Sequence, residues 1–120
     1  MEIKELRDKL LETTNVTSCA VMLIEKKGDI IEYVITDPTK TIVTLTDLVE
    51  IAKIISLRYG IVGYDKMSGG LQMTMDFFRD HITVSTARQE NILVTIVPNT
   101  VNMNIVQVIQ DVKNILIVEL

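Results

Sequence analysis

Residues 17–25 form a segment that is apolar on both of its alternating faces. Six consecutive positions carry no polar group: Cys19, Ala20, Val21, Met22, Leu23 and Ile24. Because strand side chains alternate between the two faces of a sheet, a strand of this kind must be covered above and below. The segment therefore predicts a central strand with helices on both sheet faces, which limits the possible folds more than any other part of the chain.

The composition agrees with a fold built around a sheet. The chain has 17 Ile, 14 Val and 13 Thr among its 120 residues, and β-branched side chains favour strands. We expect residues 1–120 to form a single domain, since this length suits one core. The 48% apolar content is sufficient for a core without support from a metal or a disulfide.

Hydrophobic periodicity predicts the order helix, two strands, helix, three strands, helix. In chain order the predicted elements are a helix over 2–13, strands over 17–25 and 30–35, a helix over 45–59, strands over 71–78, 81–85 and 92–97, and a final helix. The turn Lys26-Lys27-Gly28-Asp29 joins the first two strands as a hairpin, because its Gly tolerates a positive φ. The last three strands form a meander.

Capping and spacing define the predicted helices more closely. Thr44 and Asp47 fit a capping box, and Gly60 ends the middle helix. The predicted core stripe of this helix contains Leu45, Leu48, Val49, Ala52, Ile55 and Tyr59. For the final helix, the cap is expected at Asn99 or Asn102, and the predicted core stripe contains Val101, Ile105, Val108, Val112 and Ile115.

Charge and hydropathy exclude several classes of partner. The net charge is −4 and the basic residues are scattered, which argues against nucleic acid or an anionic membrane surface. The longest apolar run, at residues 19–24, is far too short for membrane insertion. With no secretory leader and the single Cys19, we expect a cytoplasmic protein.

The residues that catalysis requires are scarce. His81 is the only imidazole, and Cys19 lies in an apolar strand where a thiol behaves as a small hydrophobe. Ser68-Gly69-Gly70 lacks the Lys-Ser/Thr of a phosphate loop and leads into a strand. Zinc and EF-hand spacings are absent. We therefore expect no catalytic, cofactor-binding or metal site, and a binding or scaffolding role.

The middle helix carries apolar residues outside its predicted core stripe. Ile51, Ile54 and Leu57 lie among charged residues, which is the pattern of a protein interface. A more deeply buried helix would also explain them. The candidate partner-binding residues are Asp47, Glu50, Ile51, Ile54, Leu57 and Arg58.

Strand 71–78 is expected at a sheet edge, because the last strand docks beside the central one. This strand holds neither Pro nor Lys to discourage pairing with another chain. Its candidate dimer-interface residues share one face: Leu71, Met73, Met75 and Phe77. Met73 and Met75 could instead pack beneath a helix. A two-fold partner could cover both this edge and the middle helix.

The whole-chain order resembles the roadblock family of dynein light chains and small-GTPase regulators, over essentially residues 1–120. The hairpin at 20–30 looks like the family's apolar strand, Gly turn and return strand. The strand at 91–97, followed by Asn102-Met103-Asn104, is similar to its last strand and helix start. Met103 and Asn104 stand where the family commonly has Leu and Gly.

This resemblance implies an α+β fold in three layers, related to profilin and longin domains, with a five-stranded antiparallel sheet in the order 2-1-5-4-3. It implies a dimer joined through the third strand and the middle helix, with itself or another roadblock-like subunit. It also implies a non-enzymatic platform for a small Ras-like GTPase. Other possibilities are a small-molecule sensor with a PAS-like cavity between sheet and helix, a longin- or profilin-like interaction module, and an enzyme using Asp80 and His81.

Overall fold

The structure is a computed structural model that describes residues 2–14, 19–36, 43–60, 67–88, 90–99 and 104–119. Its elements are α1 (Ile3–Thr14), β1 (Ala20–Glu25), β2 (Ile30–Ile35), α2 (Leu45–Tyr59), the short 3-10 helix η1 (Met67–Gly69), β3 (Met73–Phe77), β4 (His81–Arg88), β5 (Asn91–Pro98) and α3 (Ile105–Glu119). The predicted order of helices and strands is confirmed. The turn at η1 was not predicted.

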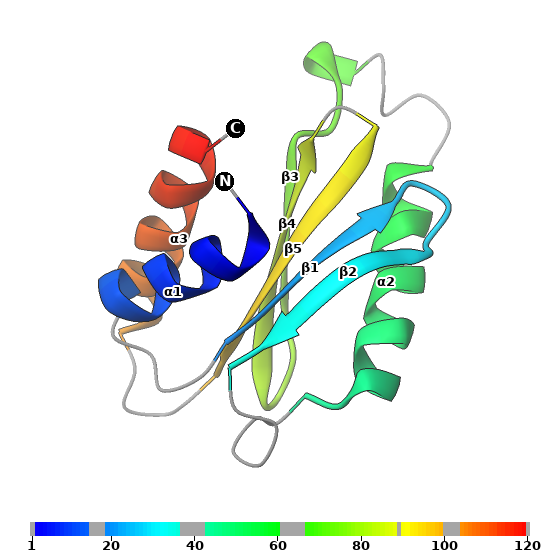
Figure 1. Ribbon diagram of the computed structural model, residues 1–120. Coiled ribbons are helices and arrows are strands. Elements are labelled where there is room, and N and C mark those ends of the chain that lie inside the picture. Colours follow the sequence, from blue (N-terminus) through cyan, green and yellow to red (C-terminus); the bar gives the residue numbers. More distant parts are fainter. Residues whose placement is uncertain are drawn as a thin grey trace.

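The five strands form one antiparallel sheet in the order β2-β1-β5-β4-β3. Helices α1 and α3 lie on one face of this sheet and α2 lies on the other, as Figure 1 shows. The predicted α+β class, three-layer architecture and strand order are therefore confirmed. The meander of β3, β4 and β5 is confirmed as well, and it places β3 at one edge of the sheet.

Strand β1 contributes to a separate core on each side of the sheet. The core beneath α1 and α3 includes Leu6, Leu10, Val21, Val84 and Val112. The core beneath α2 includes Met22, Ile24, Leu48, Ile55 and Ile96. The prediction that β1 is covered on both faces is thus confirmed, because consecutive buried side chains of this strand belong to different cores.

The β1–β2 hairpin turns at Gly28, which has the positive φ of 105° that the sequence predicted. Its N–H donates to the Glu25 carbonyl at 2.9 Å. Further along, Leu23 lies opposite Glu32 while Ile24 lies opposite Ile30, so one extra residue sits in β2. This irregularity is a β-bulge, and it interrupts the strand that forms the other edge of the sheet.

The two later helices begin at side-chain caps. The Thr44 capping box is confirmed: the Asp47 N–H donates to Thr44 Oγ1 at 3.2 Å and the Thr44 N–H donates to Asp47 Oδ2 at 2.9 Å. The prediction of Asn99 as the cap of α3 was wrong, because α3 begins at Ile105 and the Asn99 side chain instead donates to the Phe78 carbonyl. The α3 cap is Asn104, whose Oδ1 accepts from the Gln107 N–H at 3.2 Å. Asn102 and Val101 lie outside the described residues.

The buried stripe of α2 differs from the predicted one. Leu48, Ala52 and Ile55 are buried as expected, but Leu45 and Val49 are exposed. Ile51, predicted outside the stripe, is only 5% exposed and packs in the core beneath α2. The helix is therefore rotated about its own axis relative to the prediction, with Leu48, Ile51 and Ile55 turned toward β1 and β5.

Strand lengths also depart from the predicted bounds. β3 is shorter than 71–78, since Leu71 and Gln72 precede it and Phe78 belongs to the turn before β4. β4 continues past Ser85 because its ladder with β5 extends to the pair Arg88 and Asn91. Within the described ranges, no helix combines the length and apolar character that a bilayer crossing requires.

Candidate protein interaction site

The exposed edge of the sheet at β3 is the first part of the candidate site. In the described part of the chain β3 pairs with β4 alone, which confirms the predicted edge position. Met73, Met75 and Phe77 share the face on the side of α1 and α3. Met75 is 45% and Phe77 58% exposed, whereas Met73 is half-buried against the core. Leu71 lies before the strand and is half-buried. Their role in dimerisation stays a prediction.

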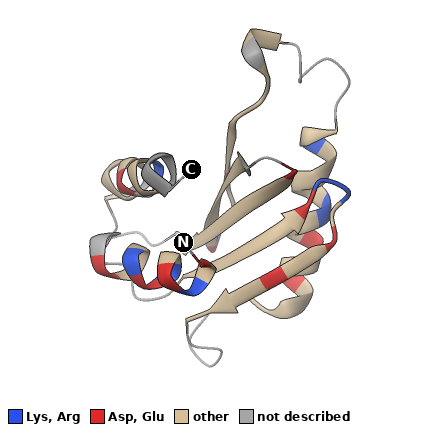
Figure 2. Cartoon of the chain, turned by 45° about the horizontal axis from the view of Figure 1, so that its top comes forward, with Lys and Arg blue, Asp and Glu red and all other residues tan. Residues whose placement is uncertain are grey.

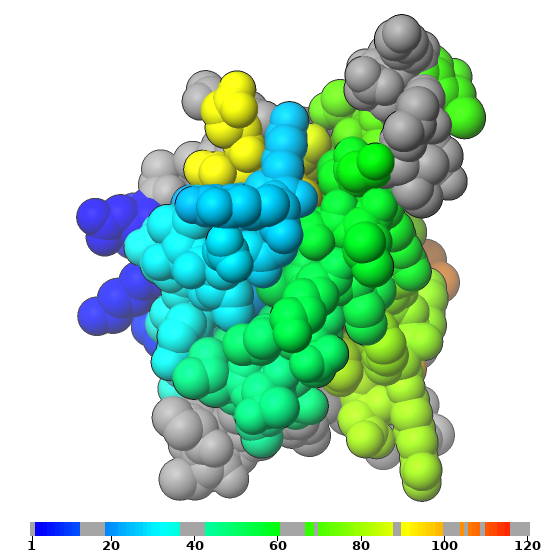
Figure 3. Space-filling model, turned by 90° about the vertical axis from the view of Figure 1, so that its right-hand side faces the viewer, coloured from blue at the N-terminus to red at the C-terminus, as the bar shows by residue number. Residues whose placement is uncertain are grey.

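The outward side of α2 is the second part. Figure 3 looks onto this face, where α2 (green) crosses the sheet between the β1–β2 hairpin (blue and cyan) and β3 and β4 (yellow-green). Ile54 is exposed and Leu57 is 73% exposed, and the exposed acidic residues Asp47 and Glu50 lie on the same helix. Ile51 does not share this surface, because its side chain is buried.

Arg58, the last predicted partner contact, is engaged within the chain. Its guanidinium Nη1 forms an ion pair with Asp76 Oδ1 of β3. The other carboxylate oxygen, Asp76 Oδ2, accepts from the Thr83 hydroxyl of β4 at 3.4 Å. The structure therefore joins Arg58 to the edge strand rather than leaving it free on the surface of α2.

A second set of polar contacts lies beside this ion pair. The Tyr59 hydroxyl donates to the Ser85 carbonyl at 3.2 Å and lies 3.1 Å from Ser85 Oγ. The Ser85 hydroxyl is also hydrogen-bonded to the Thr74 hydroxyl of β3. Burial raises the pKa of Tyr59, while its hydrogen bond with Ser85 acts in the opposite direction.

Sequence reasoning did not single out Thr74 and Asp76, whose side chains contact Ser85 and Arg58. Their only sequence signal was the polar alternation opposite the apolar face of strand 71–78, which predicts a face turned away from a dry core. Nothing in that pattern says that the last turn of α2 lies over the same face. The contact becomes visible only when the strand order is combined with the rotation of α2.

Charges of both signs are interspersed over the molecule. Figure 2 shows mixed colours on α1, on the β1–β2 hairpin and on α2. On α2, Lys53 Nζ lies 3.7 Å from Glu50 Oε1, and in the hairpin Lys27 Nζ lies 3.3 Å from Glu25 Oε2. On such a surface, a partner can form local ion pairs around apolar contacts. A surface of one charge sign would instead attract a partner over long range.

His81 occupies a packed position at the start of β4. Its ring stacks on Phe78 with centroids 4.6 Å apart. The Nε2 atom is buried and has no hydrogen-bond partner among the described residues. Burial lowers the pKa of His81, and the nearby charges of Asp47 and Asp80 act in the opposite direction. This environment favours the neutral imidazole over its protonated form and fits a packing role.

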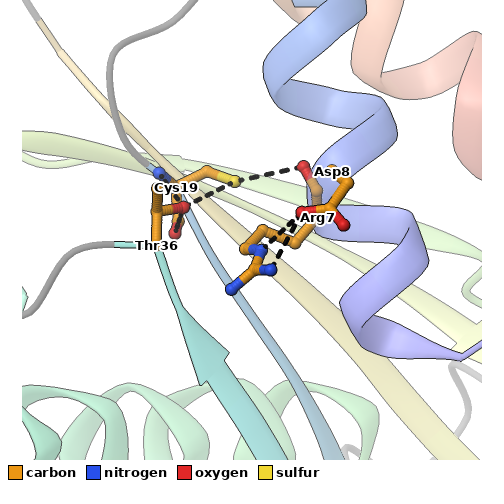
Figure 4. A network of polar contacts seen from close by, with 4 residues as sticks. All are labelled: Arg7, Asp8, Cys19 and Thr36. Carbon is orange, nitrogen blue, oxygen red and sulfur yellow. Dashed lines mark hydrogen bonds and ion pairs between the residues drawn. The ribbon is translucent and has the colours of Figure 1, made fainter.

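Cys19 is buried, and Figure 4 shows its polar contacts with α1 and Thr36. Its Sγ lies 3.8 Å from the Arg7 carbonyl of α1 and 3.7 Å from Thr36 Oγ1. Burial raises the pKa of the thiol, although the Thr36 hydrogen bond and the charge of Arg7 oppose the shift. The predicted behaviour of Cys19 as a small buried hydrophobe is confirmed.

A pocket of about 350 Å³ lies on the segment leading into β3, and its described lining residues are Met67, Ser68, Gly70, Leu71 and Gln72. These residues belong to η1 and to the segment just before β3. No group of three or more His, Cys, Asp or Glu side chains among the described residues is arranged to hold a metal.

The fold agrees with several solved structures. A Roadblock/LC7 domain from Streptomyces avermitilis superposes with a TM-score of 0.59 at 12% identity, over 99% of this chain and 96% of that one. The chain has the roadblock fold. It spans nearly the full length of that domain, so the similarity covers all three layers.

Two MglB structures are also similar in fold. The gliding protein MglB from Thermus thermophilus gives a TM-score of 0.61 at 13% identity, covering 93% of this chain and 81% of that one. An MglB with a tetrameric arrangement gives 0.65 at 12% identity, covering 93% and 80%. No protein-family model and no curated protein matches the chain in sequence. The similarity found is therefore one of fold.

Proposed function

We propose that the protein is a non-enzymatic, dimeric binding platform for a small Ras-like GTPase. The observation that carries the proposal is the combination of an exposed apolar outer side of α2, at Ile54 and Leu57, with an unpaired sheet edge at β3. Exposed apolar patches with charged surrounds are typical of protein interfaces. The roadblock fold supports the choice of partner, since the resemblance of this chain to the roadblock family implies small-GTPase regulation.

The dimer in this proposal forms by antiparallel pairing of β3 with its counterpart in a second copy or in another roadblock-like subunit. Met75 and Phe77 on β3 then gain cover that the single chain does not provide. The tetrameric arrangement of one MglB supports self-association of this fold. The partner GTPase, in the cytoplasm, docks on α2 near Asp47, Glu50, Ile54 and Leu57.

Binding to a purified Ras-like GTPase tests this function. A candidate is first identified by mass spectrometry after pull-down from native lysate and is then titrated, as its GDP form and with a non-hydrolysable GTP analogue, in a calorimeter. Ile54→Asp should weaken binding by at least about tenfold, because it places a carboxylate in an apolar contact. The fold should survive, since Ile54 is exposed.

Val106→Asp provides the matched control. Val106 is an exposed aliphatic side chain on α3, in the opposite layer of the molecule. Its substitution should leave GTPase binding unchanged. Equal binding by wild type and Ile54→Asp would remove this side of α2 from the proposal, and the absence of any Ras-like GTPase binding would contradict the proposal itself.

A further inference from the structure

The last turn of α2 and the edge strand β3 are tied together by an ion pair. Arg58 of α2 pairs with Asp76 of β3, and the Asp76 carboxylate also accepts from Thr83. The Asp76 side chain is only 12% exposed. A carboxylate so far removed from water depends on its partners, because loss of one leaves a poorly compensated charge.

A neighbouring hydroxyl network makes a second link between the same elements. Tyr59 of α2 bonds to Ser85 of β4, whose hydroxyl bonds to Thr74 of β3. Thr74 and Asp76 alternate with the apolar residues of β3, so both lie on its α2 side. The polar face of the edge strand is therefore held by the last two residues of one helix.

The other face and the outer edge of β3 have less cover within the described residues. On its other face, Met73 packs against the core while Met75 and Phe77 are exposed. Its backbone pairs with β4 on one side alone within the described part of the sheet. Strands with one neighbour and few buried apolar contacts open more easily than central strands. The contacts with α2 thus add to the β4 ladder in fixing β3 in place.

We propose that Arg58 and Asp76 form a positioning pair that fixes the edge strand β3 against α2. Through this pair, β3 is held in the conformation that meets a second copy, and docking on α2 is coupled to pairing at β3. The functional consequence rests on the proposed function. Since coupling of two binding events is reciprocal, the second copy should also strengthen docking on α2.

Amide hydrogen exchange tests whether the pair positions β3. In Asp76→Asn and in Arg58→Gln, the amides of Met73–Phe77 that bond to β4 should exchange at least about tenfold faster than in wild type. Amides of β1 and β5 should keep their protection. The matched control is Lys53→Gln, which removes a cation of α2 whose partner is the exposed Glu50 and not β3.

Charge reversal separates positioning from a general loss of stability. The double variant Arg58→Asp with Asp76→Arg restores the pair in the opposite sense, so β3 protection should return to within about threefold of wild type. If Asp76→Asn leaves β3 exchange unchanged, or if Lys53→Gln accelerates it equally, the positioning role is wrong.

Sedimentation equilibrium tests the link to self-association. Each single variant should weaken the dimer by about tenfold. The dimer of the double variant Arg58→Gln with Asp76→Asn should be no weaker than that of either single variant, because both substitutions remove the same interaction. A dimer of unchanged strength with a loosened β3 would refute the coupling. A wild type that stays monomeric would contradict the proposed function, while the exchange experiment would still decide the positioning role.

Discussion

At the scale of single residues, His81 shows how packing sets a protonation state. It is the only histidine of the chain, its ring stacks on Phe78, and its Nε2 is buried. Removal from water lowers its pKa below the usual value near 6.5 despite the charges of Asp47 and Asp80. The folded protein therefore resists a proton that the unfolded chain accepts.

The stability of the protein should consequently fall as the pH is lowered. The contribution of neutral His81 is complete above pH 6.5 and is lost as the pH falls from there through the lower pKa of the folded state. Urea unfolding at several pH values between about 7 and 5 measures this slope. In His81→Phe, which keeps an aromatic ring against Phe78, the slope should largely disappear; an unchanged slope would assign it to other groups.

At the scale of elements, the sequence predicted where helices lie better than how they are rotated. The Thr44 capping box and the Gly28 turn depend on neighbouring residues, and both were predicted correctly. The buried side of α2 depends on the residues that the helix packs against, which lie mainly on β1 and β5. A periodic pattern alone could not place Ile51 inside, because those contacts come from segments distant in the chain.

The contact of the hairpin with α2 should make Gly28 sensitive to substitution. A Cβ at this position would lie 2.8 Å from Ser56 Oγ of α2, at a φ of 105° that side chains rarely adopt. Gly28→Ala should cost about 1–3 kcal/mol of unfolding free energy. Gly60→Ala is the control, because its φ is −88° and its Cβ would lie 3.4 Å from the Ser56 carbonyl. Equal losses in the two variants would contradict this explanation.

At the scale of the whole molecule, the three layers do not cover β3 evenly. Helices α1 and α3 pack over the centre of the sheet, where Val21 and Val84 are buried, and leave Met75 and Phe77 exposed. The apolar alternation of strand 71–78 predicted that these side chains share one face. It did not predict that Met73 is half-buried while Met75 and Phe77 are exposed. Whether each methionine is covered depends on how far the helix layer reaches, which the strand pattern does not contain.

This uneven cover gives Met73 and Met75 different expected roles. Met75→Lys should weaken self-association at least about tenfold while the melting temperature stays close to that of wild type, because the new ammonium remains in water in the monomer. Met73→Lys should lower the melting temperature, since it places a charge against the core. Light scattering and thermal unfolding of both variants measure the contrast. Loss of folding in Met75→Lys would identify this residue as core.

The bulge in β2 bears on how far such an assembly can extend. A pair of molecules joined at β3 would present a β2 strand at each outer end of the combined sheet. There, Ile31 is the extra residue that breaks the register, and the exposed carboxylate of Glu32 follows it. An irregular, charged rim is a poor template for adding another strand. Growth would thus stop at a closed pair instead of continuing into a fibre.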